Sequence, residues 1–269
     1  MSPGGGLMDG SAGLMPSGQS TIIMGILNVT PDSFFDGGNF INASAAVRRG
    51  EEMIGEGADW IDVGGESSRP GAEPVTAGEE SARVIPVIRA LVRAGATVSV
   101  DTTKAAVAIK ALEEGARIVN DISAFSMDPE MAGVCAKYRA ISVLMHMRGT
   151  PKSMQSDTEY KDLAGEVYGY LEARMEYAVS RGVDRDKIIL DPGIGFGKSA
   201  EGNVELIRNI PHFKRLGRPL LVGASRKSFI GSLTGGGPGD RLAGSLAVAV
   251  AAVLKGADVL RVHDVRETK

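Results

Sequence analysis

Residues 97–120, TVSVDTTKAAVAIKALEEGARIVN, contain the smallest complete copy of the pattern that decides the fold. Two apolar runs of strand length, 97–100 and 117–119, flank a segment at 103–114 whose apolar side chains recur at the helical period. Strands joined in this way pair in parallel, because a parallel pair needs a long crossover connection. The stretch therefore predicts one strand–helix–strand unit of a parallel sheet.

Apolar runs of this kind recur eight times along the chain, at 22–27, 60–63, 97–100, 117–119, 141–145, 187–190, 220–222 and 259–262. Helix-period segments separate most of them, for example 43–56, 77–94, 163–180 and 241–255. Eight such units in about 250 residues match a (β/α)8 barrel, or TIM barrel. A doubly wound open sheet is the alternative, but it usually has a glycine-rich phosphate fingerprint after its first strand, where this chain has NVTPDSFFDGG. We therefore predict an α/β fold in which residues 21–269 form a single-domain (β/α)8 barrel.

Composition excludes several classes of function. Lys+Arg 30 against Asp+Glu 33 gives a net charge of −3 without long blocks of like charge, which argues against nucleic-acid and membrane-surface partners. Cys135 is the single cysteine, so the chain has no intramolecular disulfide framework, and we expect a cytoplasmic protein. Residues 1–20 contain no Lys, no Arg and no apolar run, and they predict a flexible tail rather than a signal peptide. The uncharged stretch 242–254 has 13 residues and is too short to span a membrane.

Polar side chains follow the ends of the predicted strands. Strands two, three, four and six end in Asp62, Asp101, Asn120 and Asp191, and barrel enzymes place their chemistry on the loops at the C-terminal ends of the strands. Buried carboxylates need a partner, and a ligand rich in N–H donors is one. For Asp101, Asn120 and Asp191 the alternative is a cap on the helix that follows, since Asp and Asn are favoured N-caps. The sequence leaves both interpretations open.

A second group of strand ends is basic. The segment GASRKS begins at Gly223 after strand seven, and Arg261 and His263 share one face of strand eight by the period of two. Together with Arg69 they form a cationic cluster at the strand ends where this fold usually binds phosphate. We interpret the cluster as a site for an anionic group such as a diphosphate, with surface salt bridges as the alternative for any single cation.

Eight motifs occur in a fixed order along the chain: MGILNVTPDSFFDGG, DVGGESSRPGA, SVDT, ND, MHMRGTPKSMQ, DPGIGFGK, GASRKSF and RVHDV. Together they resemble the dihydropteroate synthase family over residues 22–265. The resemblance implies a (β/α)8 transferase of folate biosynthesis that joins 6-hydroxymethyl-7,8-dihydropterin diphosphate to p-aminobenzoate, releasing diphosphate and forming 7,8-dihydropteroate. It also implies Mg²⁺ as cofactor, sulfonamides as inhibitors, and a homodimer formed through residues 242–254.

The same resemblance implies a role for each residue at a matching position. The pterin is expected to contact Asp101, Asn120, Met145, Asp191, Gly223 and Lys227. The diphosphate is expected to contact Asn28, Arg69, Arg261 and His263, with Asn28 as the Mg²⁺ ligand. The p-aminobenzoate region comprises Phe34, Ser68, Arg69, Pro70, Phe196, Lys227 and Ser228. Catalytic roles fall to Asp101, Lys227, Arg261 and His263.

Some features leave the resemblance incomplete. Ser68 stands where many family members have Thr, and the short stretch after strand eight predicts a shortened C-terminal helix where the family has a full one. A pterin-binding methyltransferase that acts on a corrinoid protein is an alternative with the same barrel and the same Asp and Asn residues, although the SSRPG and SRKS segments are not expected in it. A non-catalytic pterin-binding protein of the same fold is a further alternative.

Overall fold

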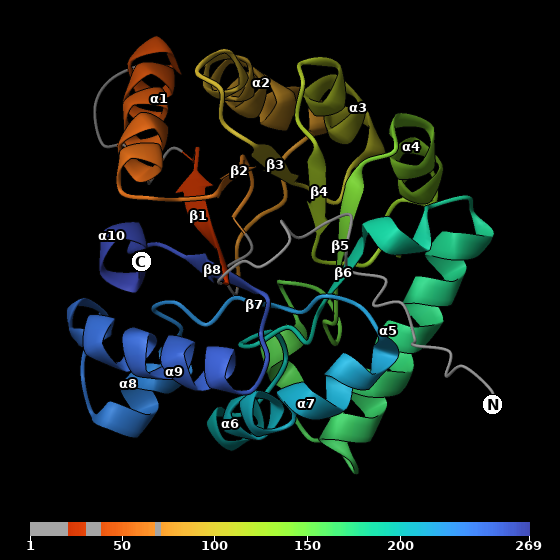
Figure 1. The fold of residues 1–269 in the computed structure, drawn as a ribbon, viewed down its shortest axis with the longest axis vertical. Coiled ribbons are helices and arrows are strands. Elements are labelled where there is room, and N and C mark those ends of the chain that lie inside the picture. Colours follow the sequence, from red (N-terminus) through yellow and green to blue (C-terminus); the bar gives the residue numbers. More distant parts are fainter. Residues whose placement is uncertain (1–20, 31–38, 68–70) are drawn as a thin grey trace, which may run out of the picture.

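Eight parallel strands form a ring in the computed structural model, which describes residues 21–30, 39–67 and 71–269 (Figure 1). The strands are β1 (Ile22–Asn28), β2 (Trp60–Gly64), β3 (Val98–Asp101), β4 (Ile118–Asp121), β5 (Ile141–Met145), β6 (Ile188–Asp191), β7 (Leu221–Val222) and β8 (Val259–Val262). Consecutive strands are neighbours, the first pairs with the last, and a parallel bridge between Leu190 and Leu220 joins β6 to β7. The predicted barrel is confirmed, and the doubly wound open sheet is excluded.

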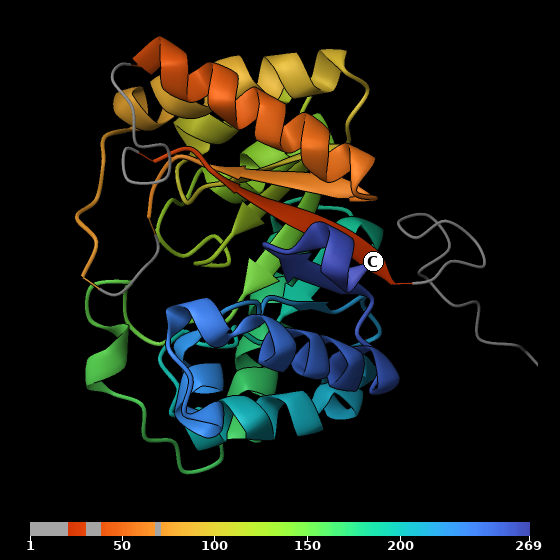
Figure 2. The same cartoon turned by 90° about the vertical axis from the view of Figure 1, so that its left-hand side faces the viewer.

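Helices surround the ring and cover its outer face (Figures 1 and 2). They are α1 (Asn39–Gly55), α2 (Ala77–Arg93), α3 (Ala105–Glu113), α4 (Met131–Tyr138), α5 (Leu163–Ser180), α6 (Ala200–Arg208), α7 (Ile210–Phe213), α8 (Ser228–Thr234), α9 (Leu242–Leu254) and α10 (Val265–Thr268). The predicted helical segments correspond to α1, α2, α3, α5 and α9, and the predicted short last helix corresponds to α10. The predicted tail, residues 1–20, lies outside the described residues. In the part of the chain that the structure describes, no helix is long and apolar enough to cross a membrane.

The barrel wall has two apolar faces. Outward-facing residues such as Ile61, Val63 and Val100 pack against the helices in one large cluster. Inward-facing residues form a separate cluster that fills the interior: Ile22, Met24, Trp60, Ile118, Val143, Ile189, Leu221 and Val259. The side-chain period of a strand is two, so the next inward positions lie two residues further along each strand. On six strands these positions are Asp62, Asn120, Met145, Asp191, Gly223 and Arg261. The strand register therefore places a polar layer directly above the apolar interior, at the barrel mouth.

Candidate active site at the barrel mouth

Four inward-facing side chains form what we call the acidic floor: Asp62 on β2, Asp101 on β3, Asn120 on β4 and Asp191 on β6. Asp62, Asn120 and Asp191 are buried, and the Asp101 side chain is 16% exposed. Asn120 Nδ2 donates to Asp62 Oδ2 at 2.9 Å, which joins two strands that are not neighbours. The capping interpretation is wrong, because the residues that cap the helices after these strands are Thr76, Lys104, Glu130 and Ser199.

Arg261 on β8 supplies the positive charge that these carboxylates need. Its Nε donates to Asp62 Oδ2 and its Nη2 donates to Asp101 Oδ2, both at 2.6 Å. Burial lowers the pKa of Arg261, but Asp62 and Asp101 raise it above its ordinary value, so the guanidinium stays charged. The residue predicted to hold a diphosphate thus also neutralises the acidic floor. An arginine has five N–H donors, and the two ion pairs use two of them, so the other three remain for an anion.

Asp101 and Asp191 keep raised pKa values despite nearby cations. Burial raises the pKa of Asp101 to about 7, and Asp62 and Glu80 add to the effect, while Arg261 opposes it. Burial also raises the pKa of Asp191 to about 6, and a hydrogen bond from the Gly193 amide opposes the shift. Groups whose proton affinity is shifted towards neutral pH by burial and by specific partners are typical of functional sites.

Lys227 enters the mouth from the start of α8, on the side opposite β3. Its Nζ lies 3.9 Å from the centroid of the Phe196 ring, a cation–π contact. Burial lowers the pKa of Lys227 to about 8, and Arg261 adds to this, while Asp191 and Asp101 raise the pKa. These interactions place the two predicted residues Lys227 and Phe196 together beside the acidic floor.

The turn that carries Lys227 has a strained backbone. Arg226 has φ +57°, a left-handed conformation that non-glycine residues rarely adopt. Its Nε donates to Asp264 Oδ2 at 2.8 Å, a second bond runs from Nη2 to Asp264 Oδ1, and Arg241 Nη1 donates to the Arg226 carbonyl at 3.0 Å. These bonds connect the loop after β7 to the loop after β8, and they stabilise the strained turn that precedes Lys227.

His263 differs from the predicted cationic role. Its backbone amide donates to Ser225 Oγ at 3.2 Å, and its Nδ1 lies 3.1 Å from the same hydroxyl. Burial, with the nearby Arg261 and Arg226, lowers the pKa of His263 to about 4. The imidazole is therefore neutral at pH 7, and in this structure it can offer an anion a hydrogen bond but no charge.

An apolar wall stands beside these polar groups. Met145, Met147, Met154 and Phe196 form one buried cluster, against which Ile122 packs. Met145 and Phe196 are predicted site residues, whereas the sequence analysis did not single out Met147 and Met154. A flat face of this kind suits an aromatic ring, because thioether sulfur and aromatic carbon contact such rings favourably.

The structure places only some of the remaining predicted residues. Asn28 ends β1 at an inward position and is half-buried. Gly223 follows β7, and a Cβ atom added to it would lie 3.7 Å from the Cβ atom of Arg261. Ser228 is exposed at the start of α8. The predicted residues Phe34, Ser68, Arg69 and Pro70 lie outside the described residues.

Three sets of residues that the sequence analysis did not select also shape the mouth. Asp62 was visible as a polar strand end, but its neighbours in space were not. Lys104 pairs with Glu66 and, at 2.5 Å, with Glu80 Oε2, which fixes the start of the loop after β2. Lys198 and His146 are joined by a hydrogen bond in the buried loops after β6 and β5. No local pattern reports that these residues meet in space.

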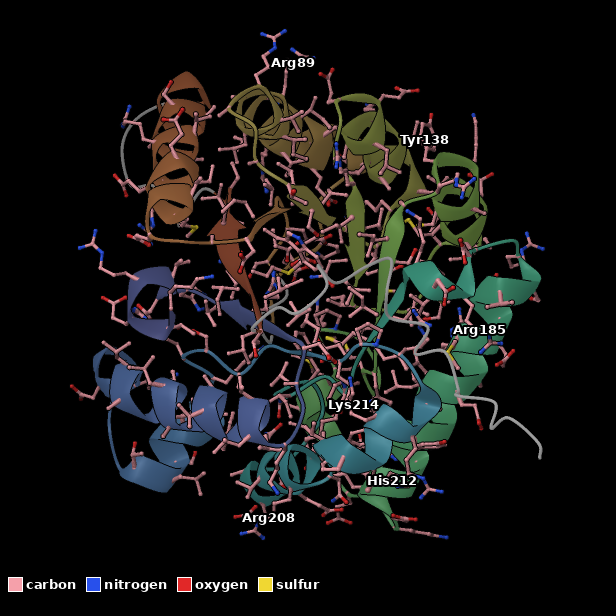
Figure 3. All side chains as sticks on the ribbon, in the orientation of Figure 1. Arg89, Tyr138, Arg185, Arg208, His212 and Lys214 are labelled. Atoms are coloured by element: carbon pink, nitrogen blue, oxygen red, sulfur yellow. The ribbon has the colours of Figure 1, made fainter. Side chains whose placement is uncertain are left out.

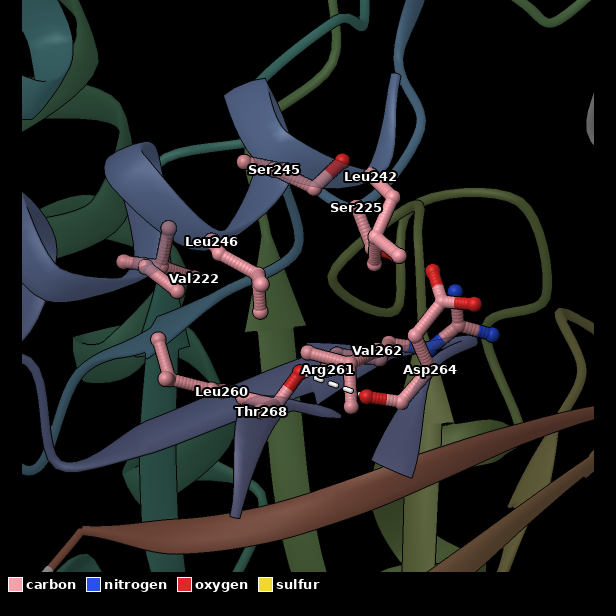
Figure 4. Close-up of a pocket in the computed structure, with 12 residues that line it drawn as sticks. Val222, Ser225, Leu242, Ser245, Leu246, Leu260, Arg261, Val262, Asp264 and Thr268 are labelled. Atoms are coloured by element: carbon pink, nitrogen blue, oxygen red, sulfur yellow. Dashed lines mark hydrogen bonds between the residues drawn. The ribbon is translucent and has the colours of Figure 1, made fainter. Parts of the chain in front are cut away.

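Other basic side chains of the described residues lie away from the barrel mouth. Arg89, Arg185 and Arg208 lie at the periphery of the molecule (Figure 3). The crevice between α9 and β8, shown in Figure 4, has a volume of about 10 Å³, which leaves room for about one water molecule. Within residues 21–30, 39–67 and 71–269, no three His, Cys, Asp or Glu side chains are grouped as a metal site.

Comparisons with known proteins agree with this geometry. Residues 24–263 match the model of the family described as pterin binding enzyme. The dihydropteroate synthase of Synechocystis sp. is 50% identical over 92% of this chain and 86% of its own length. Among solved structures, the Xanthomonas albilineans dihydropteroate synthase in complex with 7,8-dihydropteroate superposes with a TM-score of 0.84 at 42% identity, covering 92% of this chain and 89% of that one. The Yersinia pestis dihydropteroate synthase with a sulfonamide drug complex has a TM-score of 0.87 at 43% identity, covering 92% and 90%.

The ion pair between Arg261 and Asp101 predicts a measurable change in proton affinity. Arg261→Gln removes the charge that lowers the pKa of Asp101, so that pKa should rise above about 7. A pH titration of the Asp101 carboxyl carbon by NMR measures it. Arg89→Gln, which removes a surface partner of Glu114, should leave the titration unchanged. An unchanged or lower Asp101 pKa in Arg261→Gln would contradict the assignment.

Proposed function

The chain belongs to the pterin-binding enzyme family and has the dihydropteroate synthase activity of its relatives, and we propose that the barrel mouth carries this activity. One observation supports the proposal most strongly: a buried acidic floor and a cationic side, Arg261 and Lys227, meet within one ring of strand ends. The acidic floor matches a heterocycle rich in N–H donors, and the cationic side matches a diphosphate leaving group. Diphosphate release on mixing the pterin diphosphate, p-aminobenzoate and Mg²⁺ tests the activity directly.

The acidic floor holds the pterin in this proposal. Asp191 faces the N–H donors of the aminopyrimidinone edge, and charge-assisted hydrogen bonds of this kind are short and strong. Asn120 has its amide nitrogen committed to Asp62, so its oxygen stays available to accept. Lys227 donates to the carbonyl and ring nitrogen of the pterin, since an ammonium has three donors and no acceptor. Met145 and Gly223 border the ring.

The cationic side holds the diphosphate. Arg261 uses its remaining N–H donors, while its ion pairs with Asp62 and Asp101 keep the guanidinium in place. His263 adds a hydrogen bond, and an approaching anion raises its pKa from about 4 towards the cationic form. Arg69 is proposed to contribute from the loop after β2. Because these donors are fixed before the reaction, they stabilise the negative charge that develops as diphosphate leaves.

Phe196, together with Met147 and Met154 of its cluster, binds p-aminobenzoate, while Met145 of the same cluster borders the pterin. Lys227 lies over the Phe196 ring and, with Ser228, borders the same space. Phe34, Ser68 and Pro70 complete the region in this proposal. A sulfonamide of similar shape is expected to compete there, as the Yersinia pestis complex suggests.

The residues at the mouth explain how the substitution proceeds without a protein nucleophile. Asp101 and Asp191 stabilise positive charge that develops on the pterin as its methylene carbon loses the diphosphate. The Phe196 wall orients p-aminobenzoate so that its amine attacks that carbon. Both rival functions lose their support, because relatives at 42% and 50% identity are dihydropteroate synthases.

We propose that Mg²⁺ assists through Asn28. The donor chemistry fits: Asn28 presents an amide oxygen at an inward strand end, and among the described residues no group hydrogen-bonds its side chain. Mg²⁺ usually binds one or two protein oxygens together with phosphate oxygens, so a cluster of acidic ligands is not required. When bound, Mg²⁺ would neutralise charge on the diphosphate. Asn28 itself orients the diphosphate relative to Arg261.

A homodimer through α9 is the proposed assembly. Val250, Val253 and Leu254 are 59%, 38% and 82% exposed, and they border a groove of about 380 Å³ between α9 and α10. Contiguous exposed apolar groups of this kind mark interaction surfaces.

We also propose that the enzyme works in the cytoplasm, since Cys135 is free and buried and folding needs no disulfide.

Lys227→Ala should lower kcat by roughly 100-fold or more, the usual cost of removing one charged donor from a site of this kind. The melting temperature should stay near that of the wild type, because Lys227 lies in a half-buried loop position outside the core. Steady-state kinetics and circular dichroism measure the two effects, with Lys110→Ala on the exposed face of α3 as the matched control. Near-normal turnover would remove Lys227 from the mechanism.

Removal of divalent cations with EDTA should abolish turnover, and added Mg²⁺ should restore it. Asn28→Ala should raise the Mg²⁺ concentration for half-maximal activity about ten-fold, because one of few protein oxygens near the cation is lost. Asn28→Asp retains an oxygen ligand and should need no more Mg²⁺ than the wild type. Equal Mg²⁺ requirements for Asn28→Ala and the wild type would refute the assignment.

Light scattering should give twice the 28.1 kDa mass of the chain at micromolar concentration. Leu254→Asp should shift the mass to that of the monomer, because a charge buried in an apolar interface is unfavourable. Met127→Asp changes a residue that is 53% exposed away from α9, and it should remain dimeric. A monomeric wild-type protein, or a dimeric Leu254→Asp variant, contradicts the proposed interface.

A further inference from the structure

We propose that Lys198 is a positioning residue for the reaction: its buried ammonium, supported by His146, fixes the loop after β6 and thereby the Asp191 carboxylate. The inference rests on the pterin-binding role proposed above for Asp191. Lys198 is 3% exposed, and it lies seven positions after the strand residue on which it acts. Its Nζ donates to the loop backbone, at the Pro192 and Gly193 carbonyls.

Four acceptors surround Lys198 Nζ. The distances are 2.8 Å to His146 Nδ1, 3.1 Å to the His146 carbonyl, 3.0 Å to the Pro192 carbonyl and 2.8 Å to the Gly193 carbonyl. An ammonium has three donors and no acceptor, so His146 Nδ1 must present its lone pair and the other ring nitrogen carries the proton. Burial and then Lys198 lower the pKa of His146 to about 2, which keeps the imidazole neutral as this bond requires.

These contacts lead to Asp191 along two paths. Pro192 accepts from Lys198 through its carbonyl, and the amide of the same peptide group, that of Gly193, donates to Asp191 Oδ1 at 2.7 Å. His146 accepts from Lys198 through its carbonyl, and its amide, in the preceding peptide group, donates to the Asp191 carbonyl at 2.9 Å. One ammonium therefore holds the peptide group between Pro192 and Gly193 directly and the other contact to Asp191 through His146.

The loop is shaped to allow this arrangement. Gly193 has φ +71°, and a Cβ at that position would lie 1.9 Å from the His146 carbonyl oxygen. Only glycine permits such an approach. The Phe196 amide also donates to the Gly193 carbonyl, at 3.1 Å, but Asn203 Oδ1 accepts from the Gly195 amide at 2.6 Å, so the turn that leads to Phe196 has an anchor of its own. Asp191 has its hydrogen bond from the Gly193 amide, in the peptide group that Lys198 binds through the Pro192 carbonyl.

Lys198 and Asp191 also interact through their charges. Burial lowers the pKa of Lys198 well below its ordinary value, and the nearby Asp191 opposes this shift. Lys198 also lowers the pKa of Asp191, together with the Gly193 amide, Lys227 and Arg261, against the effect of burial. Its charge thus acts on a group that is proposed to bind substrate as a carboxylate.

Lys198→Met tests the inference, because it removes the charge and donors but retains most of the volume. We expect a KM for the pterin diphosphate that is about ten-fold higher, the order expected when a bond to a charged group is weakened. The KM for p-aminobenzoate should stay within about two-fold of the wild type, because Asn203 still fixes the turn before Phe196. The acidic limb of the pH profile of kcat/KM for the pterin diphosphate should move to higher pH, since the pKa of Asp191 rises when Lys198 is lost.

Arg218→Met is the matched control. Arg218 is also a buried cation, 4% exposed, that donates to the backbone of β6, but at the opposite end, through the Ile188 carbonyl at 3.3 Å. It should lower the melting temperature without moving either KM or the pH profile. Lys198→Met with wild-type KM and an unmoved acidic limb overturns the inference, whatever its melting temperature.

If Lys198→Met does not fold, His146 variants decide the question. His146→Leu removes the acceptor and should raise the pterin diphosphate KM, whereas His146→Asn replaces Nδ1 by an amide oxygen and should restore it. Equal KM values for the two variants overturn the inference. Asp191→Asn separates this failure from a failure of the proposed function: if it binds the pterin diphosphate normally, the role of Asp191 is wrong, and the role of Lys198 fails with it.

Discussion

The site depends on one electrostatic constraint: three carboxylates share the low-dielectric mouth of a barrel whose interior is apolar. Charge is costly there unless it is paired. Arg261 meets the constraint by binding Asp62 and Asp101 at once, and Asn120 satisfies a further Asp62 contact. Even so, Asp101 and Asp191 keep raised pKa values. The site is thus prepared for a ligand that brings N–H donors to one side and negative charge to the other, as the pterin diphosphate does.

The loops around this floor are held by cations that do not themselves face the substrates in our proposal. Lys104 fixes the start of the loop after β2 through Glu66 and Glu80. Lys198 fixes the loop after β6, and Arg226 joins the loops after β7 and β8 through Asp264. Each of these ion pairs or hydrogen bonds joins a loop at the barrel mouth to a neighbouring loop or helix. Preorganisation of this kind lets fixed dipoles stabilise developing charge without rearrangement during the reaction.

The sequence predicted the fold well because the two features that decide it are local. Short apolar runs at the strands and the helical period between them appear within windows of about 20 residues, and the eight runs correspond to β1 to β8. The side-chain period of two along a strand places Asp101, Asn120, Asp191 and Arg261 at the barrel mouth. The resemblance to a known family added their expected roles. The helices α6, α7 and α8 were not predicted, because they are short: they have 9, 4 and 7 residues.

Sequence by itself determined which residues lie at the strand ends and on which face, since that follows from a period of two. Tertiary structure alone decided which of them touch. Arg261 and Asp62 are 199 residues apart, and Lys198 and His146 are 52 apart, so no local pattern links them. Their contacts depend on the stagger between strands when the sheet closes. Tertiary structure also decided against the capping alternative for the strand-end acids, and it buries Lys198. It lowers the pKa of His263 as well, because proton affinity depends on burial and neighbours, which exist only in the folded chain.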